Sequence, residues 1–378
     1  MRGSVTQRSP GSWRLQWYCG KNEQGRDIYH NKTIRGGKKD AQAALHKILV
    51  ELREGTHVEP CSQTLGEYLS YWLKQTKNST VTDKTHENYS GWCNSHIIPA
   101  LGSIRLDKLK STDIQQYITD KLNGKSKLNG KETLSACSVR HHVTCLRTAL
   151  NKAVQWQLIA RSPMVGVELP RLPKTQIEIF TEEELRTLLT YTKTSRYYIP
   201  VVIASATGMR IGEIMALEWR NIDFARRLIH VTQAVESTGG KMNIKPPKNN
   251  KHRSIPVTQA TMDILRAHKI ATEQKAESLG ESYLQNDWVS PTDYGELMRI
   301  ESVKRFFPKL CKHAGISIHS IHTLRHTHAS ILLNRGVPII AVSERLGHSS
   351  IEITVNTYGH LMRGTQDGIV DVLGTLAL

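Results

Sequence analysis

The sequence lacks a long apolar stretch, a regular cysteine spacing and a nucleotide-binding loop, and each absence excludes a class of protein. The longest apolar run, residues 199–206, contains a proline and a serine and is far too short to span a bilayer. The N-terminus has no hydrophobic signal segment. The cysteines form no CxxC pair, so we expect reduced, intracellular thiols, neither a disulfide framework nor a zinc knuckle: Cys19, Cys61, Cys93, Cys137, Cys145 and Cys311.

The chain also has no G-x-x-x-x-G-K-[ST] motif and no carboxylate cluster of the kind that holds two metal ions. We therefore expect no cofactor and no bound metal. Basic residues, in contrast, are abundant: 51 Lys and Arg against 34 Asp and Glu give a net charge of +17. This excess favours nucleic acid over a membrane as the partner, although a merely basic surface has the same composition.

Polar groups at informative spacings gather near the C-terminal end. His322 and Arg325 are three residues apart, so on a helix both side chains leave the same face. A second short helix fits residues 338–346, which places His348 just past its end. Tyr358 follows ten residues later and has no obvious place in an apolar stripe. These residue types suit attack of a phenol on a phosphodiester while cations hold the phosphoryl oxygens.

A zinc-binding face is the alternative reading of this segment, because His322 and His326 are four residues apart on the expected helix. However, the string HTLRH lacks the glutamate of the metalloprotease pattern, and no third ligand is clearly placed. The spacing therefore favours phosphodiester chemistry.

The same segment resembles the catalytic signature of the tyrosine recombinases, the phage and transposon integrase family. The resemblance rests on the H-x-x-R helix, an L-G-H turn and the tyrosine of the string TYGH. It implies that Tyr358 is the nucleophile and that His322 is its general base. It also implies that Arg325 and His348 bind the phosphoryl oxygens.

The resemblance continues upstream of this segment. The string TGMRIGE matches the first catalytic arginine of the family, Arg210, and its acidic companion, Glu213, which would hold a neighbouring side chain. Counting back from the downstream I-P pair, Lys248 has the spacing of the family's lysine general acid, while Lys245 and Lys251 remain alternatives.

The function implied is that of a site-specific recombinase that integrates and excises a mobile element through a 3′-phosphotyrosine intermediate. One alternative is DNA relaxation of the type IB topoisomerase kind, which uses similar residues. Another is a non-catalytic DNA-binding regulator, which would have no reason to carry all six catalytic positions in order. The N-terminal module and the apolar tail favour recombination.

The expected fold class is α+β, mainly helical with small sheets. Residues 1–60 predict a small domain with strands at 12–18 and 26–34 and a helix that begins at Asp40 and ends at Gly55. The remaining parts are expected as follows: a four-helix core-binding domain at 62–162, a linker at 163–178, a catalytic domain at 179–362 and a tail at 363–378. Within the catalytic domain, we expect a lysine-rich hairpin closed at residues 249–250.

Basic side chains on the first two domains are candidates for DNA contact. A small sheet can enter a major groove, and basic residues on a bundle can bind phosphates. The candidates are Arg14, Lys21, Arg26, Lys32 and Arg35 on or near the sheet and Lys84, Arg140 and Arg147 on the bundle.

The expected partner is double-stranded DNA, bound at separate core and arm sites by a homotetramer. The resemblance leaves open an excisionase or a host DNA-bending protein as a further partner. We expect the protein in the cytoplasm with the nucleoid and not in a membrane.

Overall fold

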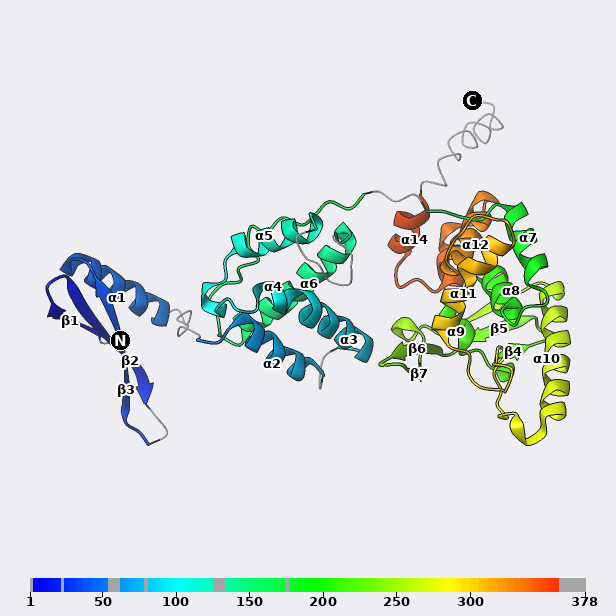
Figure 1. Ribbon diagram of the computed structural model, residues 1–378, viewed down its shortest axis with the longest axis horizontal. Helices are drawn as coiled ribbons and strands as arrows, with labels where there is room; N and C mark the ends of the chain where they lie inside the picture. Colours follow the sequence, from blue (N-terminus) through cyan, green and yellow to red (C-terminus); the bar gives the residue numbers. More distant parts are fainter. Residues whose placement is uncertain are drawn as a thin grey trace, which may run out of the picture. The chain divides into compact units, whose positions relative to one another are not determined.

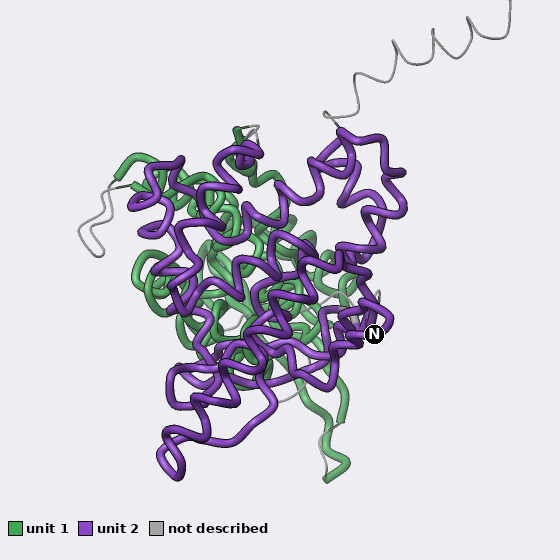
Figure 2. The backbone as a smooth tube through the Cα atoms, turned by 90° about the vertical axis from the view of Figure 1, so that its right-hand side faces the viewer, with its two compact units in different colours: residues 1–173 green, residues 174–378 purple. Residues whose placement is uncertain are grey.

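The computed structural model describes residues 3–21, 24–53, 62–77, 81–124, 133–173 and 177–359. The chain divides into two compact units, residues 1–173 and 174–378 (Figures 1 and 2). Helices dominate and the sheets have two or three strands each, which confirms the predicted fold class. The predicted tail at 363–378 lies outside the described residues.

The first unit begins with an antiparallel sheet covered on one face by a helix (Figure 1). Its elements are β1 (Gly3–Ser9), β2 (Ser12–Lys21), β3 (Asp27–Arg35) and α1 (Lys38–Arg53). Alternation along β2 buries Leu15 and Trp17 against Ala41, Leu45 and Ile48 of the helix. The prediction missed β1, because nearly all of its residues are exposed and it carries no apolar alternation.

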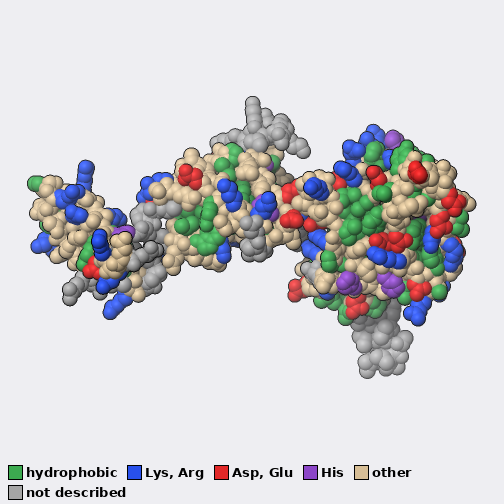
Figure 3. Space-filling view, turned by 90° about the horizontal axis from the view of Figure 1, so that it is seen from below, with side chains coloured by type: hydrophobic (Ala, Val, Ile, Leu, Met, Phe, Trp, Pro, Cys, Tyr) green, Lys and Arg blue, Asp and Glu red, His purple; other side chains and the backbone are tan. Residues whose placement is uncertain are grey.

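The opposite face of this sheet is open to solvent. The strand register places Arg14 opposite Thr33 and Gln16 opposite Asn31, all on the face that α1 leaves uncovered. Figure 3 shows many basic and few acidic side chains on the part of the chain that carries this sheet. The register also places Arg35, opposite Ser12, on the open face, which therefore combines hydrogen-bonding groups with positive charge.

A helical bundle completes the first unit. It contains α2 (Leu65–Lys77), α3 (Asp83–Trp92), the π-helix η1 (Cys93–Ile97), α4 (Ile98–Leu101), η2 (Leu106–Lys108), α5 (Ser111–Leu122) and α6 (Ala136–Gln155). Pro99 lies inside this helical stretch, which ends at Gly102. The π-helical turn lets Pro99 occupy the first turn of α4, where no N–H donor is needed. Met164, from the first half of the predicted linker, packs into the bundle core.

A buried histidine makes the bundle sensitive to acid. His142 is 2% exposed, and its Nδ1 lies 2.9 Å from the hydroxyl of Tyr117. Burial, followed by the charges of His96 and Lys121, lowers the pKa of His142 from 6.5 to about 4. The unfolded bundle therefore binds a proton at His142 at higher pH than the folded bundle does. As a result, the free energy of unfolding decreases as pH falls from 6.5 toward 4. The expected loss is about 3 kcal/mol.

Hydrogen exchange along α5 and α6 in the full chain measures this effect. We expect His142→Gln to flatten the dependence of exchange on pH between about 4 and 6.5. His141→Gln, at the exposed neighbouring position, is the matched control and should change that dependence only slightly, because the charge of His141 is the smallest influence on the pKa of His142. A pH dependence that survives His142→Gln would assign it to another group.

The second unit surrounds one large core with helices and two small sheets. Its helices are α7 (Glu182–Thr192), α8 (Tyr198–Thr207), α9 (Ile211–Met215), η3 (Trp219–Asn221), η4 (Lys248–Asn250), α10 (Gln259–Leu279), η5 (Gly280–Ser282), α11 (Ile300–His313), α12 (His322–Asn334), α13 (Ile339–Leu346) and α14 (Ile351–Tyr358). Its strands are β4 (Ile222–Asp223), β5 (Leu228–Val231), β6 (Ala234–Thr238), β7 (Lys241–Lys245) and β8 (Arg253–Pro256).

The predicted hairpin closed at residues 249–250 is wrong. β7 pairs with β6 across Gly239 and Gly240, whereas β8 pairs with β5. The lysine-rich segment between them is a connection between two sheets that contains η4. The reason is apolar burial, because Ile255 of β8 is fully buried beside Ile229 of β5.

Two glycine turns place the polar groups of this unit. Gly208 ends α8 with φ +66°, and Gly347 ends α13 with φ +68°, a left-handed conformation that favours glycine. Arg210 follows the first turn and His348 follows the second. The prediction that His348 lies just past a helix end is confirmed.

Candidate active site

Arg325 lies at the centre of the polar cluster in the second unit. It projects from α12, is 2% exposed and donates from Nη1 to the carbonyl of Gly208 at 2.8 Å. Burial, then repulsion from Arg210, lowers the pKa of Arg325 to about 9, so the guanidinium is still charged at neutral pH. Its Nη2 is buried and has no hydrogen-bond acceptor among the described residues. A buried donor of this kind suits an anionic ligand oxygen.

Arg210 is held beside it by a carboxylate and a turn. It caps the N-terminus of α9, and its Nη1 donates to Oε1 of Glu213 at 3.1 Å. Its Nη2 donates to the carbonyl of Gly347 at 3.0 Å. Burial alone would raise the pKa of Glu213, but Arg253 and Arg210 outweigh burial and hold the pKa below its usual value. Glu213 is therefore an ionised carboxylate that fixes two guanidinium groups.

His348 is oriented by the helix that follows it. Its Nδ1 lies 2.7 Å from Oγ1 of Thr354 on α14, which leaves Nε2 as the ring nitrogen able to meet a ligand. Burial, followed by the charges of Arg325 and Arg210, lowers the pKa of His348 to about 4. The ring is therefore neutral at physiological pH.

Tyr358 lies at the end of α14, and its hydroxyl contacts a histidine of α12. The ring is 1% exposed and packs against Ala329, Leu333 and Leu346, although the sequence around it gives it no place in an apolar stripe. Its hydroxyl lies 2.7 Å from Nδ1 of His326. Burial raises the pKa of Tyr358 to about 12, while the positive charge of Arg325 acts in the opposite direction.

His322 does not hold the phenol directly in this state. Its ring meets the ring of His326 edge-on, with centroids 4.8 Å apart. Burial, then the neighbouring charges of His326 and Arg325, lowers the pKa of His322 to about 4. The two histidines and Tyr358 thus form a connected row that starts on α12 and ends at the phenol.

The three candidate lysines differ in what they contact. Lys245 forms an ion pair with Glu236 at 2.6 Å. Lys251 donates to the carbonyl oxygens of His348 at 3.0 Å and Ser349 at 3.3 Å. Lys248 is exposed in η4, and within the described residues it makes no hydrogen bond or ion pair. Among these three candidates, Lys248 is therefore the one that can reach a ligand without breaking a hydrogen bond or an ion pair.

Comparison with known proteins decides the identity. Residues 178–364 match the phage integrase family, and residues 64–122 match the SAM-like N-terminal domain of phage integrases. The chain belongs to the tyrosine recombinases. It is therefore a DNA-acting enzyme, a site-specific recombinase, and the predicted family is confirmed.

Relatives of this recombinase cover nearly its whole length. A XerC-like tyrosine recombinase of Caldanaerobacter subterraneus subsp. tengcongensis is 28% identical, and the match covers 96% of each chain. The ICEBs1 integrase of Bacillus subtilis is 26% identical over 99% of this chain and 100% of its own. The Tn1549 transposon integrase bound to transposon right end DNA has the same fold, with a TM-score of 0.68, 20% identity and coverage of 82% and 100%.

The candidate DNA-binding residues on the N-terminal sheet of the recombinase differ in their placement. Arg14 lies on the open face, where its Nε donates to Oδ1 of Asn31 at 3.0 Å, and Arg35 is on the same face at the end of β3. Lys21 and Arg26 are exposed near the β2–β3 turn. Lys32 is paired with Leu15, so it belongs to the face that α1 covers.

On the bundle of the recombinase, two of the three candidate basic residues have local partners. Lys84 forms an ion pair with Glu87 at 2.6 Å, and Arg140 donates to the carbonyl of Pro170 at 3.1 Å. Arg147 is half-buried on α6.

None of the helices in the described ranges is long and apolar enough to cross a bilayer.

Sequence reasoning missed two side chains of this site and one contact of a third. His326 was considered only as a partner of His322 in a zinc face, and the described residues contain no group of three metal-ligating side chains. Arg253, which binds Glu213, gave no signal beyond its position two residues before the I-P pair. Lys251 was considered only as a general acid, although it supports the turn at His348.

Proposed function

We propose that Tyr358 is the nucleophile of this recombinase and that it attacks a DNA phosphodiester within the polar cluster described above. A bond forms between the phenol oxygen and phosphorus while the bond from phosphorus to the 5′ oxygen breaks. The products are a 3′-phosphotyrosine and a free 5′ hydroxyl. Attack by a 5′ hydroxyl of another strand reverses these steps and needs no ATP, because the ester retains the energy of the broken bond.

Arg325 and Arg210 are the proposed ligands of the nonbridging oxygens, on which negative charge grows in the transition state. Each offers a planar fork of N–H donors that matches such oxygens. The buried Nη2 of Arg325, which has no acceptor in the described part of the chain, is the observation that carries this proposal. His348 donates a further hydrogen bond from Nε2.

His322 is the proposed general base and Lys248 the proposed general acid. The ring of His322 lies against that of His326, which contacts the phenol hydroxyl. His322 reaches the phenol once the hydroxyl leaves His326. The ammonium of Lys248 gives its proton to the 5′ oxygen as that bond breaks.

Covalent capture on DNA tests the nucleophile without altering the protein. In a duplex with a nick just beyond the cleavage position, cleavage releases a short fragment that carries the 5′ hydroxyl. Once this fragment has diffused away, the strand cannot be resealed and the covalent complex accumulates. We expect the DNA-linked peptide, identified by mass spectrometry, to carry a 3′ phosphate on Tyr358. A link to any other residue, or no link, would overturn the proposed function.

The proposed assembly is a homotetramer on DNA, which integrates and excises a mobile element. Exchange between two duplexes cuts four strands, and each chain supplies one proposed nucleophile, so four copies are needed. An excisionase or a host DNA-bending protein would set the direction of the reaction. Core sites would lie against the bundle and the second unit, and arm sites against the N-terminal sheet.

The open face of the sheet is the proposed surface that reads arm sites. Asn31 holds Nε of Arg14, which leaves the terminal nitrogens of that guanidinium for a base edge. We expect Arg14→Ala to weaken binding by about 1–3 kcal/mol to duplexes that the wild-type chain selects from a random pool. Lys32→Ala is the matched control, because Lys32 belongs to the other face and should change affinity little. Equal losses for the two variants would indicate general electrostatic attraction instead of base reading.

A further inference from the structure

Arg253 lies between Glu213, which binds Arg210, and the turn that carries His348. It lies on β8, and its side chain is 10% exposed. Its Nη2 donates to Oε2 of Glu213 at 2.7 Å, and its Nη1 donates to Oε1 at 3.2 Å. This two-point contact leaves the carboxylate little freedom to rotate.

Arg253 and Arg210 share that carboxylate. Glu213 is 1% exposed and also accepts from Nη1 of Arg210 at 3.1 Å and from its backbone N–H at 2.9 Å. Without the charge of Arg253, the buried carboxylate would either take up a proton or turn wholly toward Arg210. In both cases the Arg210 guanidinium would lose its present position.

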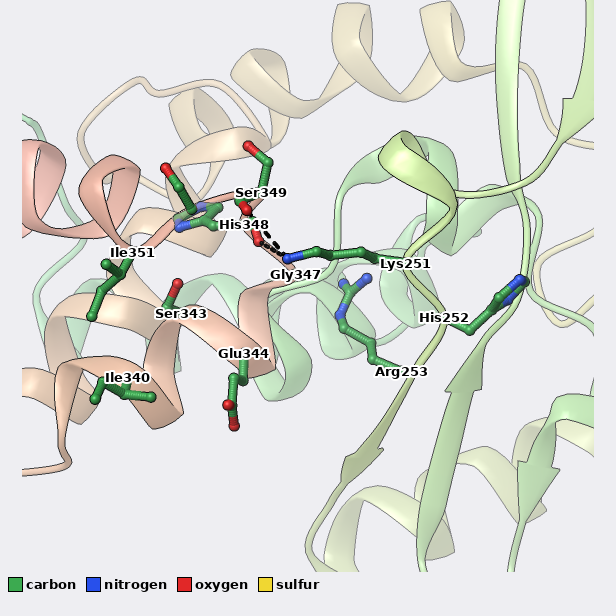
Figure 4. Close-up of a pocket in the computed structure, with 11 residues that line it drawn as sticks. Lys251, His252, Arg253, Ile340, Ser343, Glu344, Gly347, His348, Ser349 and Ile351 are labelled. Carbon is green, nitrogen blue, oxygen red and sulfur yellow. Dashed lines mark hydrogen bonds between the residues drawn. The ribbon is translucent and has the colours of Figure 1, made fainter.

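The same side chain also supports the turn that precedes His348 (Figure 4). Its Nε donates to the carbonyl of Arg345 at 2.9 Å, near the end of α13. Its guanidinium lies against Gly347, where an added Cβ would come within 2.8 Å of Nη1. The carbonyl of Gly347 in turn accepts from Nη2 of Arg210 at 3.0 Å. Arg253 therefore touches both supports of Arg210, the carboxylate and the turn.

Lys251 adds a second link between the same two segments. It lies two residues before Arg253 and donates to the carbonyls of His348 and Ser349, as the dashed lines of Figure 4 show. The segment from η4 to β8 thus carries Lys248 at one end and is fastened to the His348 turn at the other. Motion of this segment relative to the turn would break both contacts.

We propose that Arg253 is a positioning residue for phosphodiester cleavage: it fixes Arg210 through Glu213 and holds the turn that carries His348. It does not itself touch the phosphate. This inference rests on the proposed function, because it assigns to Arg253 the support of a group that binds the scissile phosphate.

The test compares cleavage of a normal and a charge-neutral phosphate in single-turnover reactions. We expect Arg253→Gln to slow covalent capture on the nicked phosphodiester by about 10- to 100-fold, as is typical when an outer partner of a functional group is lost. DNA affinity should stay within about twofold, because affinity is spread over many phosphate contacts and Arg253 is proposed to make none. Arg266→Gln, an exposed arginine paired with Asp263 on α10, is the matched control and should cleave normally.

Replacing one nonbridging oxygen by methyl separates positioning from folding. Both diastereomers are neutral, but in the one whose methyl replaces the oxygen that Arg210 contacts, Arg210 has no acceptor on the phosphorus to hold. The defect of Arg253→Gln should shrink to a few-fold with that diastereomer and persist with the other. A defect of the same size with all three substrates would mean that Arg253 serves the fold alone, and wild-type rates would also overturn the inference.

A second variant keeps the inference testable if Arg253→Gln does not fold. Arg253→Lys retains the charge but cannot make the two-point contact, so it should show a smaller slowing with the same dependence on the diastereomer. The wild-type chain distinguishes failure of the proposed function from failure of the inference about Arg253. If it forms no 3′ adduct, the proposed function fails; if it forms the adduct and the variants match it, only the role of Arg253 fails.

Discussion

Replacing Tyr358 with phenylalanine is expected to abolish covalent capture of nicked DNA, with a fall in cleavage rate on the order of 10⁴-fold or more. The change removes one oxygen and leaves the ring, which still fills the space between Leu333 and Leu346. Loss of the hydrogen bond to His326 should cost only about 1 kcal/mol of stability, so the chain should fold and bind DNA normally.

The measurement is the yield of protein-linked DNA on a denaturing gel, beside a binding titration with the same duplex. Tyr191→Phe is the matched control, since Tyr191 is a tyrosine on α7 that is 45% exposed. Capture that survives in Tyr358→Phe would show that another residue attacks the phosphate. Loss of both capture and DNA binding would show that the substitution disturbs more than the nucleophile.

The ionisation of the cluster explains why the phenol should be inert without DNA. Burial raises the pKa of Tyr358 to about 12 and lowers that of His322 to about 4, so transfer of a proton between them is strongly uphill in the DNA-free chain. A phosphodiester among the arginines adds negative charge, which favours the charged form of a nearby histidine and raises its pKa. The same charge disfavours a free phenolate, so the proton of Tyr358 should leave only as the bond to phosphorus forms.

Short-range spacing made His322, Arg325 and His348 predictable, whereas Arg210 and Glu213 were predicted from the resemblance of the string TGMRIGE to the family. His322 and Arg325 share one helix, His348 follows a glycine that ends a helix, and Arg210 lies three residues before Glu213, so each local pattern survives folding. The predicted sheet and bundle followed from apolar periodicity in the same way.

The missed features depend on contacts between distant segments. Arg253 meets Glu213 across 40 positions of sequence, and His326 meets Tyr358 across 32, which no periodicity indicates. β8 joins β5 and not β7, because the choice of partner depends on where Ile255 can be buried. The apolar surroundings of Tyr358 were likewise hidden, because Leu333 and Leu346 come from two other helices.

Arg325→Ala is expected to lower the rate of cleavage by about 10³-fold, equivalent to about 4 kcal/mol of transition-state stabilisation. The side chain is 2% exposed, so its removal leaves a cavity beside the carbonyl of Gly208, which loses its donor. The loss of that bond should cost about 1–3 kcal/mol of stability, which thermal unfolding would register separately.

Added guanidinium ion tests whether Arg325 acts through its donors. The ion fits the cavity of Arg325→Ala and carries the same planar set of N–H groups, so it should restore part of the cleavage rate with saturation. Arg335→Ala, an exposed arginine at the end of the same helix that pairs with Glu182, should show neither the loss nor the rescue. Rescue by ammonium to the same extent would imply that charge alone is needed. The buried Nη2 of Arg325 is the donor assigned to the phosphate. If Arg325→Ala cleaves DNA at the wild-type rate, the proposed phosphate site is therefore wrong.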